Sequence, residues 1–305
     1  MRPATAFAPG SIGNVGPGFD VLGLAVDGLG DRVRIELTDG PSRIESITGR
    51  DAELIPRDAK RNTAAIAATA WLRAAGIASN VTIHLEKGLP LSGGLGGSGA
   101  SSVAGAYAAA VASGQTAPDM RSIIAAALEA EQTVSGRHLD NIAATALGGL
   151  TLVRSADPID VIRLPVPDRW RVVLVTPKAR VETRAARAVL PEEWAQASWV
   201  QQMANTAALA HAFATADEEL ARRALEDLYA EPRRSTFIPR FHLIKRAALE
   251  NGSFGCSISG SGPTIFALVT GADAARCADA VREALGDVGG EIQVAPIARK
   301  GVRIL

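Results

Sequence analysis

The sequence predicts an α+β protein with two domains, residues 1–165 and 166–305. Strand-like and helix-like segments alternate in both halves of the chain, which is typical of domains that layer helices on a sheet. The 305 residues are enough for two domains of ordinary size. The segment PVPDRW at residues 165–170 carries two prolines, and we therefore place the domain boundary there.

Short apolar runs and one helical pattern precede the central part of the first domain. The helix is expected over Asn62–Ala75, because Asn62 is a good N-cap residue and Gly76 ends the pattern. The expected strands are Thr5–Ala8, Val21–Asp27, Arg32–Thr38, Arg43–Thr48 and Val81–Lys87.

Helical patterns dominate the rest of the first domain. An Ala-rich run, Ala100–Ala112, is followed by two further expected helices, Asp119–Thr133 and Leu139–Leu147. Two strands, Thr151–Arg154 and Asp160–Leu164, are expected to end the domain.

The second domain is predicted to mix strands and helices in the same way. Pro232 and Pro239 bracket an expected loop. The expected strands are Arg171–Thr176, Phe254–Ile258, Thr264–Thr270 and 290–296, the middle two forming a hairpin. The expected helices are 182–189, 194–214, 217–230, 240–251 and 272–285.

Composition excludes several classes of protein. Hydrophobic residues make up 47% and charged residues 21% of the chain, which predicts a soluble protein with a substantial core. The net charge is +0, so neither nucleic acid nor a membrane is expected as a partner. Residues 88–118 are uncharged, but their Gly, Ala and Ser do not predict a membrane span. The N-terminus lacks a signal peptide's apolar core, and Cys256 and Cys277 match no metal motif, so we expect a cytoplasmic protein.

The most informative stretch is Gly88–Ser102, GLPLSGGLGGSGASS, which contains six glycines and no charged residue. It lies between an expected strand and an expected helix. Glycines allow tight turns and a close approach of backbone N–H groups to a ligand. The first turn of a helix adds unpaired N–H groups and the positive end of the helix dipole. This order of elements predicts an anion site, most often one for phosphate.

Two known glycine motifs do not fit this loop. A P-loop requires Lys and then Ser or Thr after its last glycine, whereas Gly99 is followed by Ala100. Gly94, Gly96 and Gly99 do fit the G-x-G-x-x-G spacing of dinucleotide-binding proteins. That motif also needs an acidic residue after a second strand, and Asp119 follows a loop instead.

Three stretches together resemble the GHMP kinase superfamily, named for galactokinase, homoserine kinase, mevalonate kinase and phosphomevalonate kinase. They are APGSIGNVGPGFDVLG (8–23), PLSGGLGGSGASS (90–102) and FGCSISGSGPTIFAL (254–268). Within the superfamily the details look like the homoserine kinase family, through NVGPGFDVLGLA (14–25), HLDNIA (138–143) and EPRRSTFIPRF (231–241). The resemblance implies a two-domain GHMP kinase fold, with the active site in the cleft. The N-terminal domain would be like the second domain of ribosomal protein S5, and the C-terminal domain would be ferredoxin-like.

The resemblance also implies the activity and its cofactors. The expected reaction is ATP-dependent phosphorylation of the side-chain hydroxyl of L-homoserine to O-phospho-L-homoserine, on the route to threonine. Mg²⁺, which prefers hard oxygen ligands, would be held by Ser98 and Glu131, with Glu129 as a nearby alternative. The family usually has a further serine where this chain has Gly97. The residues implied for ATP are Asn62, Lys87, Pro90, Leu91, Ser92, Gly93, Gly94, Leu95, Gly96, Gly97, Ser98, Gly99 and Ala100.

Homoserine carries a carboxylate, an ammonium and a hydroxyl, and the chain has matching side chains. Arginine binds carboxylates through two parallel donors. Arg187 and Arg234 match the family positions, with Arg184 and Arg233 close by in sequence. The ammonium calls for carboxylate or amide oxygens. The full implied substrate-binding set is Asn14, Asp20, His138, Asp140, Asn141, Arg187, Arg234 and Gly260.

The implied catalytic residues are Asn141, His138, Ser98 and Glu131. Asn141 stands where several relatives in the superfamily carry a catalytic aspartate, and an amide cannot act as a base. The resemblance therefore implies that Asn141 orients the hydroxyl for in-line attack on the γ-phosphate. His138 as a general base is the competing hypothesis, although a substrate-binding role is favoured for it.

Two other functions stay open from the sequence. One is another GHMP small-molecule kinase, and the other is an inactive sensor that binds ATP and a metabolite. The arginine pair favours a carboxylated substrate over galactose, and mevalonate lacks the ammonium that Asp20 and Asp140 would bind. A sensor need not keep Ser98 and Glu131. Exposed strand edges and the resemblance suggest a homodimer.

Overall fold

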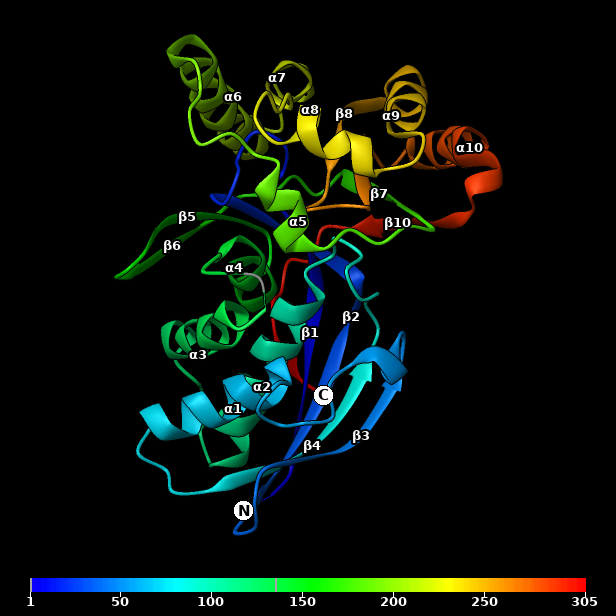
Figure 1. Cartoon of the computed structure of the whole chain (residues 1–305). Helices are drawn as coiled ribbons and strands as arrows, with labels where there is room; N and C mark the ends of the chain where they lie inside the picture. Colours follow the sequence, from blue (N-terminus) through cyan, green and yellow to red (C-terminus); the bar gives the residue numbers. More distant parts are fainter. Residues whose placement is uncertain (1, 135) are drawn as a thin grey trace.

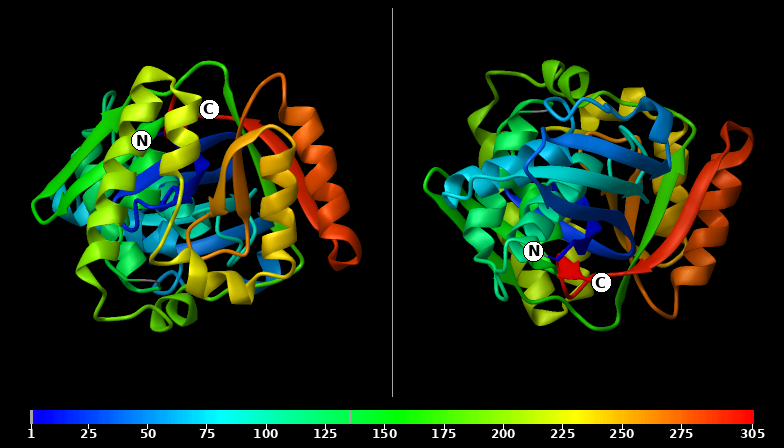
Figure 2. Two further views of the ribbon diagram at one scale, coloured as in Figure 1. Left: turned by 90° about the horizontal axis from the view of Figure 1, so that it is seen from above. Right: turned by 90° about the horizontal axis from the view of Figure 1, so that it is seen from below.

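The protein was analysed as a computed structural model, which describes residues 2–134 and 136–305. Within those residues the chain builds two sheets (Figure 1): the first takes its strands from residues 1–165 and from the C-terminal strand β11, and the second takes its strands from the rest of the chain. The β5–β6 hairpin projects from the body on the side opposite α10 (Figures 1 and 2). The predicted boundary at 165–170 lies between β6 and β7, which belong to different sheets.

The first sheet runs in the order β11-β1-β2-β4-β3, with the β5–β6 hairpin joined to β2. Along β2, Val33 and Ile35 are buried whereas Arg32 and Arg34 are exposed, so one face of the sheet meets water. The strands are β1 (Ala4–Gly13), β2 (Leu22–Thr38), β3 (Arg43–Gly49), β4 (Asn80–Lys87), β5 (Leu150–Ala156), β6 (Ile159–Leu164) and β11 (Arg303–Ile304).

Four helices gather on the other face of this sheet (Figure 1). The helix that follows the glycine loop, α2, is buried along most of its length because its Gly, Ala and Ser side chains allow close packing. At Gly105 a Cβ would stand 2.4 Å from the carbonyl oxygen of Ala64, so α1 and α2 touch through their backbones. The helices are α1 (Thr63–Ala74), α2 (Gly97–Ala112), α3 (Met120–Gln132) and α4 (Asp140–Leu147).

The second sheet has the antiparallel order β10-β7-β9-β8, which is the order of a ferredoxin-like βαββαβ unit. Both of its faces are covered, and β7 is accordingly apolar at successive positions. Val173 and Val175 pack with α9 and α10, whereas Val172 and Leu174 join the core that the first domain also forms. The strands are β7 (Trp170–Pro177), β8 (Ser253–Ile258), β9 (Ile265–Thr270) and β10 (Gly290–Pro296).

The helices of the second half surround this sheet, and some lie between the sheet and the first domain. They are α5 (Thr183–Ala188), α6 (Gln196–Thr215), α7 (Glu218–Ala224), α8 (Glu231–Arg234), α9 (Phe241–Glu250) and α10 (Ala274–Leu285), with 3₁₀ turns at Ala52–Leu54, Ser235–Phe237 and Gly286–Val288. Among the described residues no helix is both long and apolar enough to cross a membrane.

Three parts of the predicted secondary structure are wrong. The two strands expected over 21–38 are one strand, β2, because a register shift at Pro9/Gly10 absorbs the irregularity near Gly28 without a turn. The loop expected between the two prolines begins with α8, since Pro232 sits in a first turn, where its missing N–H is harmless. The helix expected over 217–230 ends at Ala224, because the Asp227 carboxylate accepts the N–H groups of residues 229–231.

A buried ion pair fixes the entry to the glycine loop. The Asp31 carboxylate on β2 is fully buried and contacts the Lys87 ammonium at the end of β4. Asp31 also accepts hydrogen bonds from the N–H groups of Gly88 (3.0 Å) and Leu89 (3.2 Å) and from Ser101 Oγ (2.6 Å). One carboxylate therefore joins the sheet, the loop and α2.

We predict that Asp31→Ala lowers the free energy of unfolding by about 3–5 kcal/mol, because it leaves the buried Lys87 ammonium without its counter-charge. Urea unfolding followed by circular dichroism measures this change. Glu86→Ala is the matched control. Glu86 precedes Lys87 and forms a half-exposed ion pair with Arg32, which follows Asp31. This control should change the free energy of unfolding by less than about 1 kcal/mol. Equal losses in the two variants would contradict the prediction.

Candidate active site

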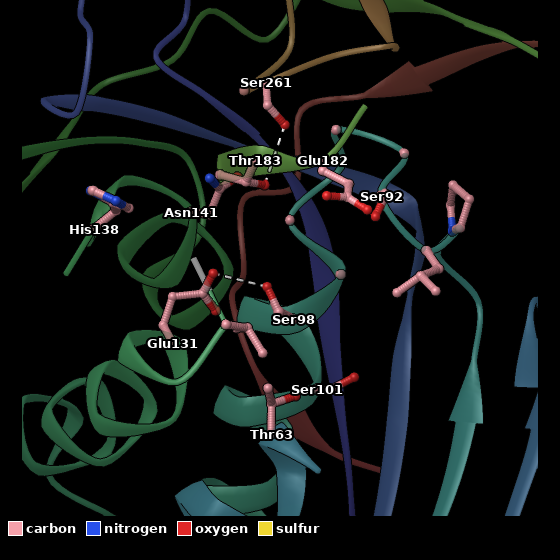
Figure 3. A pocket seen from close by; sticks show the side chains of 18 of the residues that line it. Thr63, Ser92, Ser98, Ser101, Glu131, His138, Asn141, Glu182, Thr183 and Ser261 are labelled. Carbon is pink, nitrogen blue, oxygen red and sulfur yellow. Dashed lines mark hydrogen bonds between the residues drawn. The ribbon is translucent and has the colours of Figure 1, made fainter. Parts of the chain in front are cut away.

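A cavity of about 680 Å³ lies between the two domains and is lined by both (Figure 3). From the first domain it receives the turn after β1, the glycine loop and the ends of α3 and α4. From the second domain it receives the start of α5, Arg234 of α8 and the turn between β8 and β9. All eight residues predicted to bind the substrate line this cavity, so the structure brings together positions that are up to 246 residues apart.

The backbone of the glycine loop is held from the second domain. Thr264 Oγ1 donates to the carbonyl of Gly93 (2.5 Å), and Ser259 Oγ donates to the carbonyl of Gly94 (2.5 Å). Gly94 and Gly96 have positive φ angles of 78° and 65°, where a side chain is strained. At Gly96 a Cβ would stand 2.1 Å from Ser11 Oγ, so only glycine fits.

The helix α2 begins at Gly97, beside the cavity, so its first N–H groups have no intrahelical acceptor. The sequence predicts an anion site at this position. Three residues expected to bind ATP do not line the cavity. Leu95 is packed in the core, Gly99 lies against α4, and the N–H of Ala100 already donates to the carbonyl of Gly96 (2.9 Å).

Two other residues predicted to bind ATP are engaged by the protein itself. The Lys87 ammonium contacts Asp31, Ser101 Oγ (3.0 Å) and the carbonyl of Gly97 (3.1 Å), so its three N–H donors are taken and it supports the loop from below. Asn62 caps α1 by accepting from the N–H of Ala64 (3.1 Å), and its amide donates to the carbonyl of Pro56 (2.9 Å). Asn62 thus fixes the Ile55–Pro56 wall of the cavity.

The two candidate carboxylates for a metal differ in position. Glu131 is buried at the end of α3, and its Oε1 accepts a hydrogen bond from Ser98 Oγ (2.9 Å; Figure 3). Glu129 lies outside the cavity and forms a half-exposed ion pair with Arg73 (2.6 Å). In the part of the chain that the structure describes, no three His, Cys, Asp or Glu side chains form a metal-binding group. The Ser98 and Glu131 oxygens are the hard donors that suit Mg²⁺.

The turn after β1 carries the acidic side of the cavity. Asn14, in a left-handed conformation, accepts the N–H of Asp20 on its side-chain oxygen (3.1 Å) and donates from Nδ2 to the carbonyl of Gly260 (3.0 Å). The Asn14 N–H donates to Asp140 Oδ2 (3.0 Å). Burial, together with the negative charge of Asp20, raises the pKa of Asp140 to about 6.

Arg187, Asp20 and His138 form one charged cluster. The Arg187 guanidinium donates to both carboxylate oxygens of Asp20 (2.8–3.1 Å) and lies 3.2 Å from His138 Nδ1. Burial alone would raise the pKa of Asp20, but hydrogen bonds from His138 and Arg187 lower it below its ordinary value. Burial alone would lower the pKa of His138, but Asp20 raises it above its ordinary value.

Arg234 and Asn141 are the remaining residues predicted to bind the substrate. Arg234 is buried and donates to the carbonyls of Ala186 (3.0 Å) and Gly260 (2.8 Å). Asn141, in the first turn of α4, accepts a hydrogen bond from Ser11 Oγ on Oδ1 (2.9 Å). This bond orients the amide, so its Nδ2 donors face the other way.

Thr183 is a polar residue at the site that no sequence signal identifies, whereas Ser261 belongs to the 254–268 stretch that carries the family resemblance. Thr183 and Ser261 come from α5 and the β8–β9 turn, and their hydroxyl oxygens lie 3.4 Å apart (Figure 3). Asp51 lies outside the cavity lining, but it accepts from the N–H of Leu91 in the glycine loop (2.9 Å) and from the Arg180 guanidinium of the second domain (2.7 Å). Isolated polar residues such as Thr183 and Asp51 are common on surfaces, so only the fold singles them out.

Comparison with known proteins gives the class of protein that this fold and site define. Residues 62–149 match the family described as GHMP kinases N terminal domain, and residues 209–287 match GHMP kinases C terminal. The chain therefore has the two-domain GHMP kinase fold, as the sequence predicts.

Relatives that match over the full length of the chain identify the family within this class. The homoserine kinases of Chlorobium phaeobacteroides (strain BS1) and Chloroherpeton thalassium are 37% and 40% identical, and the matches cover 100% of this chain and of both relatives. The crystal structure of homoserine kinase from Cytophaga hutchinsonii has a TM-score of 0.94 at 39% identity and covers 100% of this chain and 98% of that chain. This chain belongs to the homoserine kinase family of phosphotransferases.

The pKa of Asp140 can be tested without a substrate. We predict that its carboxyl titrates near pH 6, being protonated below and ionised above, and that Asp20→Asn moves this midpoint to lower pH by removing a negative charge. Carboxyl-carbon NMR shifts over a pH series, assigned with Asp140→Asn, measure the midpoint. An unchanged or higher midpoint in Asp20→Asn would contradict the electrostatic coupling.

Proposed function

We propose that this protein transfers the γ-phosphate of ATP to the side-chain hydroxyl of L-homoserine and forms O-phospho-L-homoserine on the route to threonine. The main support for this proposal is the arrangement of charged side chains in one cavity. Two arginines and two aspartates surround a space beside the N-terminus of α2. A small zwitterion can thus lie next to a phosphate site.

The arginines are the carboxylate side of this site. Nε of Arg187 is buried and has no hydrogen-bond partner among the described residues, so it is a free donor. Arg234 is held rigidly by two backbone carbonyls. A substrate α-carboxylate supplies the acceptors that these donors require. Asp140, which accepts a hydrogen bond from the N–H of Asn14, supplies a negative charge for the α-ammonium.

The nucleotide occupies the other end of the cavity. Its phosphates lie at the glycine loop and the first turn of α2, and its adenosine end lies toward the wall of Ile55, Pro56 and Asn62. Ser98 and Glu131 would hold Mg²⁺, which neutralises phosphate charge when it is bound.

The transfer needs positioning more than proton abstraction, because the transferred phosphoryl group forms little new bonding in the transition state. Asn141, oriented by Ser11, donates a hydrogen bond to the substrate hydroxyl and directs it in line. His138 is engaged with Asp20 and Arg187, which supports the binding role over that of a general base.

We propose two further properties on more general grounds. A cytoplasmic location agrees with the two buried free thiols, Cys256 and Cys277. A homodimer agrees with β6, whose only strand partner among the described residues is β5, so that an edge is left for a second copy.

The reaction is tested by ADP release with Mg·ATP against L-homoserine, L-serine, L-threonine, mevalonate, galactose and shikimate. We expect turnover with L-homoserine far above the rest. Mevalonate, galactose and shikimate lack the ammonium, and L-serine and L-threonine carry their hydroxyl on a shorter arm than L-homoserine does. Turnover of a different compound would assign another GHMP kinase activity. ATP binding without any turnover would indicate a sensor.

We predict that Glu131→Gln and Ser98→Ala each lower kcat by about 100-fold or more while the fold is kept, because each removes an oxygen ligand that neutralises phosphate charge. Glu131→Gln should also need more Mg²⁺ for half-maximal rate. Glu129→Gln is the matched control on the same helix, since it alters only the surface pair with Arg73. Near-normal turnover in both site variants would show that the metal lies elsewhere.

A further inference from the structure

Phe19 lies between the two arginines of the proposed carboxylate site. The Cζ atoms of Arg187 and Arg234 are 5.0 Å and 5.3 Å from the centroid of its ring. The ring of Tyr229 meets it edge-on, with centroids 5.0 Å apart. One aromatic ring is therefore in contact with two cations that come from different helices, α5 and α8.

Two guanidinium groups this close repel each other. Burial, and then the positive charge of Arg187, lower the pKa of Arg234. The negative face of an aromatic ring attracts cations, so a ring in contact with both offsets part of this repulsion. Asp20, the residue after Phe19, forms an ion pair with Arg187 (2.8 Å). Consecutive residues of one turn thus act on the arginine pair.

The turn that carries Phe19 is itself fixed from the second domain. The carbonyl of Pro17 accepts hydrogen bonds from Gln202 Nε2 (2.9 Å) and Thr206 Oγ1 (2.9 Å), both on α6. At its other end, the N–H of Asp20 donates to Asn14 Oδ1. With both ends held, the direction of the Phe19 ring is set by the fold and not by the substrate.

We infer that Phe19 is a positioning residue that sets the separation and orientation of the Arg187 and Arg234 guanidiniums, and thereby determines selectivity for a substrate with a carboxylate. This inference rests on the proposed function. The proposed role of Phe19 is in binding the substrate carboxylate before the reaction. We therefore predict an effect on KM for the amino acid rather than on kcat.

The test compares L-homoserine with L-homoserine amide, whose neutral carboxamide keeps the ammonium and the hydroxyl. Phe19→Leu and Phe19→Met remove the ring at similar volume, and Phe19→Tyr keeps it. In the Leu and Met variants we expect kcat/KM for L-homoserine to fall about tenfold through KM, with less than a twofold change for the amide and for KM of ATP. The Tyr variant should remain near the unaltered protein.

Three results would overturn the inference. An equal loss on both substrates would mean that the ring only supports the fold, and circular dichroism of each variant would show such damage. An unchanged KM for L-homoserine in folded Phe19→Leu or Phe19→Met would mean that the arginines need no ring. Lack of L-homoserine turnover by the unaltered protein would instead overturn the proposed function, and this inference with it.

Discussion

The glycine loop must pass between two rigid neighbours, and this close approach governs the rest of the site. On one side, the buried Asp31 carboxylate accepts hydrogen bonds from N–H groups at the start of the loop. From the second domain, the hydroxyls of Ser259 and Thr264 donate hydrogen bonds to carbonyls of the loop. Any side chain at Gly94 would meet the backbone oxygens of the β8–β9 turn at less than 3 Å. The glycines therefore do more than bend the chain, because they let the second domain contact the loop that is predicted to bind phosphate. The position of this loop depends on both domains.

Charge in the cavity is arranged in opposing pairs. The carboxylates of Asp20 and Asp140 repel each other when both are ionised, and the guanidiniums of Arg187 and Arg234 repel each other in the same way. The two acids and the two arginines attract each other, and this attraction offsets both repulsions. Hydrogen bonds from His138 and Arg187 hold the pKa of Asp20 below its ordinary value, whereas burial and the negative charge of Asp20 raise the pKa of Asp140 to about 6. A zwitterion with an ammonium and a carboxylate completes this balance without adding net charge. This explains physically why an amino acid suits the cavity better than a sugar.

The sequence predicts the layered elements well because their apolar periods are regular, and it predicts the converging motifs through their resemblance to one family. It does not predict how Lys87 is used. A lysine that ends a strand before a glycine loop suggests a phosphate contact, but the acid that neutralises it, Asp31, lies on another strand. The role inferred for Phe19 is hidden for the same reason, since both of its arginines lie more than 160 residues away along the chain. Pairings between residues far apart along the chain depend on the topology of the fold, and the type of a single residue does not reveal its partner.

The same topology supports the role proposed for Asn141, in which an amide stands in place of a base. Asn141 lies in the first turn of α4 and Ser11 belongs to β1. Gly96 is so close to both that a Cβ there would stand 2.1 Å from Ser11 Oγ and 2.8 Å from Asn141 Oδ1. The amide is therefore fixed by its neighbours before any substrate binds. A fixed donor costs no reorganisation when the hydroxyl attacks. In a loose phosphoryl transfer, early loss of the hydroxyl proton gives little help, and in the proposed mechanism a rigid Asn141 would supply the positioning that the reaction needs.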